Sequence, residues 1–277
     1  RDLRMSRGLG DVYKRQSQNQ LLFLQVEKKR KLLIRISRIL VLLGFLAIWE
    51  ITARCGLIDV FFYSCPTRVA RCFLEMTKNN QLFMHIGVSL YETILSFFII
   101  MIGSVLVASL LWRFQTMSSV VEPVFVLLNS LPKSALAPLI IVWLGTGIRT
   151  IVIAGISVAI FGCIINLYTC FKNTDSEKQK LIRILGGKKR HIFFMVVLPA
   201  ARETILSNMK VNIGLALVGV MIGEFLAARQ GLGYLIIYAS QVFKLDWLIL
   251  CILILCFIAV CLYSLIQMIE RRLSVKI

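Results

Sequence analysis

The sequence predicts an all-α protein that crosses a lipid bilayer about six times, and three observations support this. Hydrophobic residues make up 58% of the 277 residues and charged residues only 17%, whereas soluble domains have about 45–50% and about 25%. The mean hydropathy is +0.82, and the apolar residues gather in runs of about 20, the length that crosses the hydrocarbon core as a helix. The Lys and Arg residues lie between these runs. The net charge of +18 therefore reflects membrane orientation, and we expect no nucleic-acid partner.

The N-terminal part of the chain divides into segments of different composition. Residues 1–16 are polar, have no hydrophobic period and resemble translated adapter or vector sequence. We set them apart as non-native read-through or a disordered tail, with a natural cytoplasmic tail as the alternative. Residues 17–35 form a basic segment that we expect in the cytoplasm. Residues 36–273 form the transmembrane domain, and residues 274–277 form a short cytoplasmic tail.

Six apolar segments are candidates for membrane spans. The uncharged ones are residues 93–112, 150–171 and 247–269, and those with one or two charges are residues 36–53, 119–143 and 204–227. A cleaved signal peptide is the alternative for the first segment, because residues 39–49 have the length of its apolar core. No small-x-small cleavage site follows, so we expect an uncleaved span.

The basic residues predict the orientation of these spans. Eighteen Lys and Arg residues lie in the N-terminal segment, the second and fourth connections and the C-terminal end, against seven in the other connections. Because positive charge accumulates on the cytoplasmic side, both termini and the connection between spans four and five are predicted to be cytoplasmic.

That fourth connection, residues 173–199, has a pattern of its own. Leu181, Ile182, Ile184 and Leu185 fall on one side of a helix expected over residues 175–185. Asp175 or Thr174 can cap its start, and Gly186-Gly187 can end it in a left-handed turn. A basic turn and re-entry into the membrane at Pro199 follow. Such a helix could lie on the lipid surface or dock into a groove of a partner.

Several residues inside the predicted spans are candidates for the solute pathway or for helix packing. Pro132 and Pro138 disrupt helix geometry in span three, and a broken helix at membrane depth must be covered by protein or line a cavity. Lys133 beside the break and Glu224 in span five are intramembrane charges, which usually face the interior. Lys210 can instead snorkel to the interface, and Glu224 can bind Arg229 or a backbone donor.

Gly219 and Gly223 in span five form a small-xxx-small motif that permits close helix approach. We expect it to pack within one subunit, with a subunit interface as the alternative.

The sequence has no pattern for a metal or nucleotide site. The eight cysteines form no metal-ligand spacing, His85 and His191 have no ligand partners nearby in sequence, and no P-loop motif is present. We therefore expect a membrane protein that binds no metal or cofactor and is not an enzyme.

The fourth connection resembles the coupling loop of ABC importer permeases. That loop has the pattern E-A-A, three residues, G, nine residues, I-x-L-P, and Gly186, Val196, Leu198 and Pro199 match its spacing. Lys180-Leu181-Ile182 stand at the E-A-A positions, which is a departure from the pattern. Further motifs resemble the nitrate/sulfonate/taurine branch in the same order: Trp49-Glu50, Cys65-Pro66-Thr67, residues 131–139, residues 143–147, and Gly223-Glu224-Phe225 with residues 231–236.

The resemblance implies the type I ABC importer permease fold in the prokaryotic plasma (inner) membrane. It implies a second permease subunit in a homodimer, an extracytoplasmic solute-binding protein, and cytoplasmic ATPase subunits that carry ATP and Mg. Leu181, Ile182 and Leu185 would then seat in the ATPase. The solutes of this branch are nitrate, alkanesulfonates, taurine and some aromatic cofactor precursors such as pyrimidines.

The main alternative is a gradient-driven secondary transporter. Such a transporter should have broken helices in both halves, and only span three has one.

Overall fold

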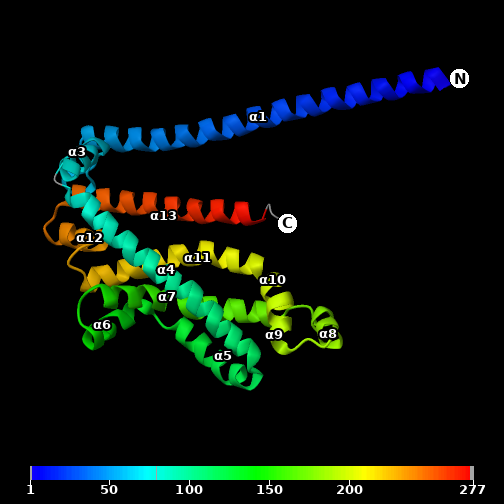
Figure 1. The fold of residues 1–277 in the computed structure, drawn as a ribbon. Coiled ribbons are helices and arrows are strands. Elements are labelled where there is room, and N and C mark those ends of the chain that lie inside the picture. The colour runs from blue at the N-terminus through cyan, green and yellow to red at the C-terminus, as the bar shows by residue number, and fades with distance from the viewer. Residues whose placement is uncertain (1, 79, 275–277) are drawn as a thin grey trace. The chain divides into compact units, whose positions relative to one another are not determined.

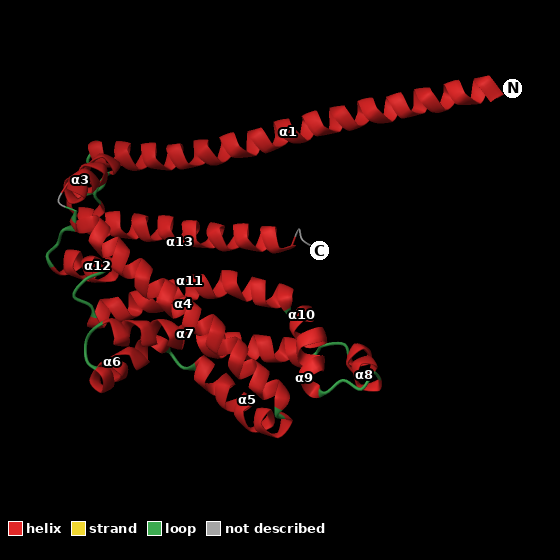
Figure 2. Ribbon diagram, in the orientation of Figure 1, coloured by secondary structure: helices red, strands yellow, loops and turns green. Residues whose placement is uncertain are grey.

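The computed structural model describes residues 2–78 and 80–274, and the regular elements of this part of the chain are all helices (Figures 1 and 2). The chain forms two compact units, Arg1–Arg68 and Val69–Ile277. The all-α membrane fold predicted from the sequence is confirmed.

The first unit consists mainly of α1 (Asp2–Arg54), followed by the short α2 (Val60–Tyr63) and the start of α3 (Pro66–Lys78). Its end is tied together by Glu50, whose carboxylate accepts hydrogen bonds from Arg54 Nε at 2.7 Å and from the Thr67 hydroxyl at 3.0 Å. Trp49-Glu50 and Cys65-Pro66-Thr67, two of the motifs singled out in the sequence, therefore meet in space.

The helix α1 begins well before the span expected from residue 36. Its apolar window covers Leu32–Arg54, close to the predicted 36–53. The same helix includes residues 2–16, so the structure has a helix where we considered a disordered tail. Arg and Leu, which together make up five of the 15 residues in that stretch, have high helix propensity. At the other end of the chain, α13 (Leu245–Ser274) reaches the first residue of the predicted tail, and residues 275–277 lie outside the described residues.

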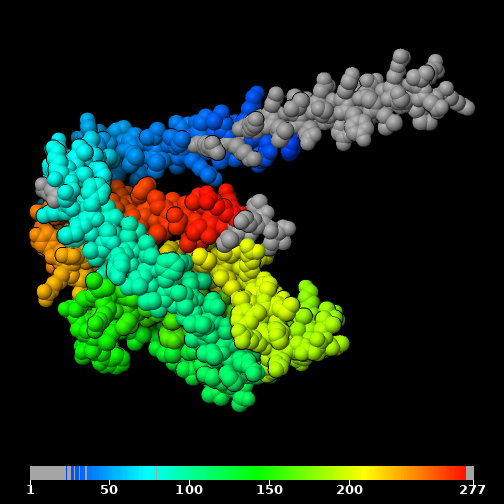
Figure 3. All heavy atoms as spheres, in the orientation of Figure 1, coloured from blue at the N-terminus to red at the C-terminus, as the bar shows by residue number. Residues whose placement is uncertain are grey.

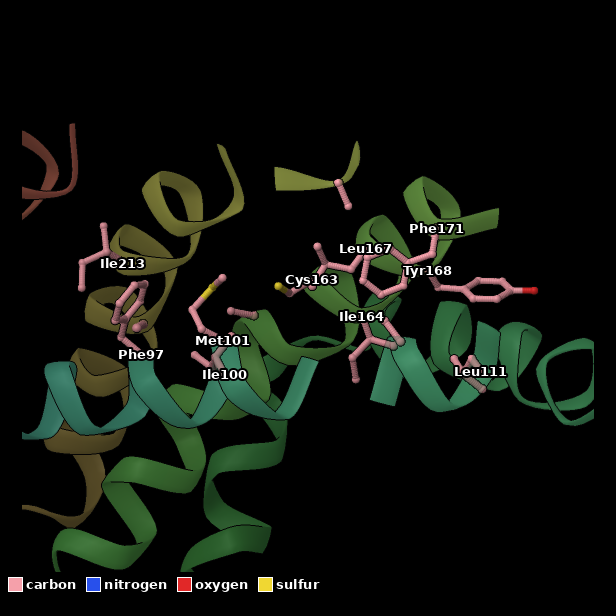
Figure 4. Close-up of a cluster of buried hydrophobic side chains, with 14 of the residues drawn as sticks. Phe97, Ile100, Met101, Leu111, Cys163, Ile164, Leu167, Tyr168, Phe171 and Ile213 are labelled. Carbon is pink, nitrogen blue, oxygen red and sulfur yellow. The ribbon is translucent and has the colours of Figure 1, made fainter. Parts of the chain in front are cut away.

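The second unit has its core where α4 (Gln81–Arg113), α7 (Ile148–Lys172) and α11 (Arg202–Ala227) pack together. Figure 4 shows buried side chains of these three helices gathered in one cluster. Its labelled members are Phe97, Ile100, Met101, Leu111, Cys163, Ile164, Leu167, Tyr168, Phe171 and Ile213. The helices α12 (Leu232–Gln241) and α13 pack against α11.

Glycine allows α7 and α11 to approach closely. A Cβ atom on Gly219 would lie 2.8 Å from the Cα atom of Gly155, and one on Gly223 would lie 2.9 Å from the Cα atom of Ile151. Cβ atoms do not approach backbone atoms so closely in proteins. Both glycines of the small-xxx-small motif therefore face α7 of the same chain, as expected for packing within one subunit.

Five helices in the described part of the chain are long and apolar enough to cross a membrane, or six if one bent pair counts as a span. The five windows are Leu32–Arg54, Gln81–Arg113, Ile148–Lys172, Arg202–Ala227 and Leu245–Arg272. The second begins 12 residues before the predicted span 93–112. The sequence-based boundary stopped at Glu92 because a charge ended the apolar run, whereas the folded chain buries Glu92 completely.

The bent pair is α5 (Gln115–Ser130) and α6 (Lys133–Leu144), which meet at 98°. Leu131 between them has the extended conformation that a following proline favours, so the predicted break lies at Pro132. Pro138 lies inside α6 without ending it, because the missing N–H deprives only the carbonyl of Ser134 of its helical donor.

Candidate functional site

The predicted helix of the fourth connection is present as α8 (Ser176–Ile184). The Asp175 side chain caps its start by accepting a hydrogen bond from the Glu177 N–H at 2.8 Å. Gly186 ends it with φ of +82°, and the Gly187 N–H donates to the Ile182 carbonyl at 2.8 Å. A Cβ atom on Gly187 would lie 2.7 Å from that carbonyl oxygen. Both glycines are thus needed for the turn, Gly186 for its backbone angle and Gly187 for space.

One side of α8 presents apolar side chains that the rest of the chain does not cover. Leu181 is 56% exposed, Ile184 82% and Leu185 74%, and we call these three residues the α8 apolar face. Ile182 differs from them, because it is partly buried against the core of the second unit. Of the four apolar residues expected on one side of this helix, three are therefore exposed on the surface, and Ile182 packs against the interior. A contiguous exposed apolar face is typical of a site that contacts a partner protein or the membrane.

Packed side chains join α8 to the helices of the core. The short α9 (Lys189–Ile192), a π-helical turn (Phe193–Val197) and α10 (Leu198–Ala200) lead from it into α11. Ile192 and Val197 are buried, and the ring of Phe193 lies edge-on to that of Phe171 at 5.6 Å between centroids. Figures 1 and 3 show α8 and α9 at one end of the second unit, where α8 stands at its edge.

The remaining coupling-loop candidates lie on this connection. Val196 and Leu198 are half-buried, and Pro199 is exposed in α10. The basic turn expected at residues 188–190 is the start of α9. The connection is thus a series of short helical turns whose packed side chains link α8 to α7 and α11.

A cavity of about 430 Å³ lies at the opposite end of the second unit. It is lined by the N-terminal parts of α4 and α7, by the C-terminal end of α11 and by the loops that precede α7 and α12. Glu92 of α4 and Arg229 before α12 are among its lining residues.

Glu224 is a buried anchor for the loop beside this cavity. Its carboxylate accepts hydrogen bonds from the Ser89 hydroxyl at 2.6 Å and from the Gly233 N–H at 2.6 Å. The Leu232 N–H donates to the Ser89 oxygen at 2.8 Å, and the Gly231 N–H donates to His85 Nδ1 at 2.9 Å. Side chains of α4 and α11 thus bind three successive N–H groups at the start of α12. Of the two structural partners considered for Glu224, the structure has the backbone donor.

Lys133 lies at the first position of α6, beside the break at Pro132. Its ammonium group donates to the Leu128 carbonyl at the end of α5 and lies 5.3 Å from the centre of the Phe161 ring. It therefore bridges α5, α6 and α7. Pro132, Lys133 and Pro138 lie together on the bent pair, apart from Glu224, which belongs to the α12 loop network.

Lys210 also has a partner in the described chain. It forms an ion pair with Glu270 of α13 at 2.6 Å, so it connects α11 to α13.

Sequence reasoning missed Glu92, Ser89 and His85 as parts of a common site. Glu92 was placed outside span two, and His85 was set aside because no ligand partner lies nearby in sequence. An acidic residue 12 positions into a long apolar helix is itself a signal, but Glu224 and the start of α12, which complete the site, lie more than 130 residues away along the chain.

Comparison with known protein families identifies the family of this chain. The family described as "Binding-protein-dependent transport system inner membrane component" matches residues 99–275, which is more than half of the chain. The chain belongs to this family. It is a membrane permease component of an ABC importer, and the family resemblance found in the sequence is confirmed.

Curated relatives cover most of this permease. A Haemophilus influenzae protein named as an ABC transporter permease is 27% identical over 86% of this chain and 97% of its own length. A Bacillus subtilis protein named as an aliphatic sulfonates transport permease is 26% identical over 82% of this chain and 83% of its own. Permeases named for sulfonates and for taurine are both among the relatives, which places the chain in that branch.

The fold has a solved counterpart. The crystal structure of an amino acid ABC transporter with histidines contains a chain that matches with a TM-score of 0.56 and 19% identity, over 72% of this permease and 98% of that chain. At this identity the match concerns the fold alone. It supports the type I permease architecture for the helices described above.

Proposed function

We propose that this permease forms the solute pathway of an ATP-driven importer and that a separate cytoplasmic ATPase acts on it through the α8 apolar face. The observation that carries the proposal is a short, capped helix whose Leu181, Ile184 and Leu185 are exposed while Ile182 packs against the core. A rigid helix with an uncovered apolar face fits a partner's groove. ATP and Mg would bind the partner, since this chain has no P-loop.

The same proposal includes further partners. The family description names dependence on a binding protein, so we propose an extracytoplasmic solute-binding protein and a second copy of this permease in the membrane. The relatives named for sulfonates and taurine support a small organic solute of that type. Pro132, Lys133 and Pro138 are the proposed pathway residues, because the bent pair interrupts a helix where only protein or a cavity can cover it. Glu224, which lies beside the cavity, is the fourth proposed pathway residue.

The distribution of basic residues supports a cytoplasmic position for α8, and cysteine labelling tests this orientation. In a variant without natural cysteines, Lys180→Cys on α8 should react with a membrane-impermeant maleimide only from the cytoplasmic side. The matched variant Arg229→Cys, at the opposite end of the second unit, should react only from outside. Both side chains are exposed, so access to the reagent is governed by the membrane. Labelling of position 180 from outside would contradict the proposed role of α8.

The energy source is tested by reconstitution into proteoliposomes with the binding protein and a candidate ATPase. Uptake of an alkanesulfonate or taurine is expected to require ATP on the side of the membrane where the ATPase is bound. The uptake should continue when ionophores collapse the ion gradients. The control is the permease without ATPase, which should show only background uptake. Uptake that needs a gradient and no ATPase would instead support the secondary transporter.

A further inference from the structure

The carboxyl groups of Glu92 and Glu224 meet inside the second unit. Glu92 comes from α4 and is fully buried, and Glu224 comes from α11 and is 1% exposed. Glu92 lies one turn of α4 after Ser89, whose hydroxyl donates to the Glu224 carboxylate at 2.6 Å, and this brings the two carboxyl groups within hydrogen-bonding reach of each other. Two carboxyl groups in contact within a membrane domain require an explanation, because a buried charge is costly unless it is paired.

The hydrogen-bond donors around the pair are unequally shared. Glu224 accepts from Ser89 and from the Gly233 N–H, each at 2.6 Å. Within the described part of the chain, neither carboxyl oxygen of Glu92 has a donor. A hydrogen bond between the two carboxyl groups is possible only if one of them carries a proton, since a carboxylate can only accept.

The charged and titratable groups on the surrounding elements do not neutralise the pair. They are His85 and Tyr91 on α4, Arg149 on α7, Arg229 before α12, Tyr234 and Tyr238 on α12, and Lys244 and Asp246 at the start of α13. His85 accepts the Gly231 N–H at Nδ1, so that nitrogen has no proton and the ring is uncharged. Arg149 and Arg229 are exposed, and Lys244 lies over the Trp247 ring. Among the described residues, no ion pair reaches either carboxylate.

The surroundings of Glu92 indicate which cation the carboxyl pair can bind. Both of its oxygens are shut off from water, although the residue lines the cavity wall. A metal cation needs several oxygen ligands at open positions, and an organic cation needs room of its own. A proton needs neither. Two neighbouring buried carboxyl groups share one proton, because two negative charges cannot both persist side by side in a buried site.

We propose that Glu92 and Glu224 form a proton-binding site, in which one shared proton holds the α12 loop against α4. Loss of the proton leaves two negative charges in contact. Their repulsion acts on Glu224, which holds Ser89 and Gly233, and so loosens the loop beside the cavity. The site goes beyond the proposed function, because it requires neither an ATPase nor a particular solute.

The first test measures the proton directly. Infrared spectra of the full-length permease in nanodiscs at neutral pH should contain the C=O stretch of a protonated carboxylic acid, which a carboxylate lacks. The band should be lost in Glu92→Gln and retained in Glu203→Gln, whose carboxylate is exposed on the same helix as Glu224. Absence of the band from the unaltered protein at neutral pH would overturn the proposal, whether or not the Glu92 variant folds.

The second test measures the effect of the proton on stability. The folded state keeps a proton that the unfolded state releases above the ordinary Glu pKa of about 4.3. Stability should therefore fall as pH rises from about 5 through neutral until the folded pair also loses its proton, with the unfolding equilibrium constant increasing by up to about tenfold per pH unit. Glu92→Gln, which keeps the shape of the protonated acid, should remove this dependence, and Glu203→Gln should keep it. Equal pH dependence in the Glu92 variant and the unaltered protein, or a dependence on sodium in place of pH, would refute a proton site.

Discussion

Replacement of Leu185 by aspartate is expected to reduce ATP-driven uptake to background while the permease still inserts and folds. Leu185 is 74% exposed, so the fold loses little when it changes. In the proposed complex the same side chain is buried in the ATPase groove, where loss of an apolar anchor costs about 2 kcal/mol or more, roughly a 30-fold loss of affinity. An unpaired aspartate buried in the groove adds a further cost.

The measurement is uptake and binding-protein-stimulated ATP hydrolysis in proteoliposomes that contain equal amounts of each permease. Ser176→Asp is the matched control, because it adds the same charge to α8 nine residues earlier. Nine residues are two and a half turns, so this aspartate lies on the other side of the helix. Normal uptake by a well-expressed Leu185→Asp protein would rule out the α8 apolar face as the contact with the ATPase.

Substitution of Gly219 by alanine is expected to disrupt packing of α7 against α11. The added Cβ atom would lie 2.8 Å from the Cα atom and 2.9 Å from the carbonyl oxygen of Gly155. Both are backbone atoms, so no side chain can turn aside and the helices must separate. Overpacking in a close-packed core costs about 1–3 kcal/mol, and we expect the upper end of this range or more.

The readout is the amount of folded permease recovered from membranes and its midpoint of thermal unfolding. Gly214→Ala provides the matched control on the same helix, because a Cβ atom there has no neighbour within 4 Å. The control should unfold like the unaltered protein. If the two alanine variants were equally stable, the close approach of α7 and α11 at Gly219 could not be important for the fold.

Local features of the fold were predictable where short-range chemistry determines them. The break at Pro132 follows from the geometry that proline imposes on its predecessor. The bounds of α8 follow from Asp175 and Gly186, because a cap and a left-handed turn depend only on neighbouring residues. The start of α4 was predicted wrongly, since a rule that ends an apolar run at a charge cannot anticipate a carboxyl group buried by other helices.

By itself, the sequence determined the helical membrane class, the approximate spans and the α8 helix with its apolar residues. Run length, charge position and helical period suffice for these, because each depends on residues within one segment. Only the tertiary structure decided that Glu224 meets Ser89, 135 residues away, that Glu92 lies against the same carboxylate, and that Ile182 turns inward while Leu185 stays exposed. Such pairings depend on how whole helices pack, on the 98° bend between α5 and α6 and on glycine-mediated contact between α7 and α11, none of which a single segment specifies.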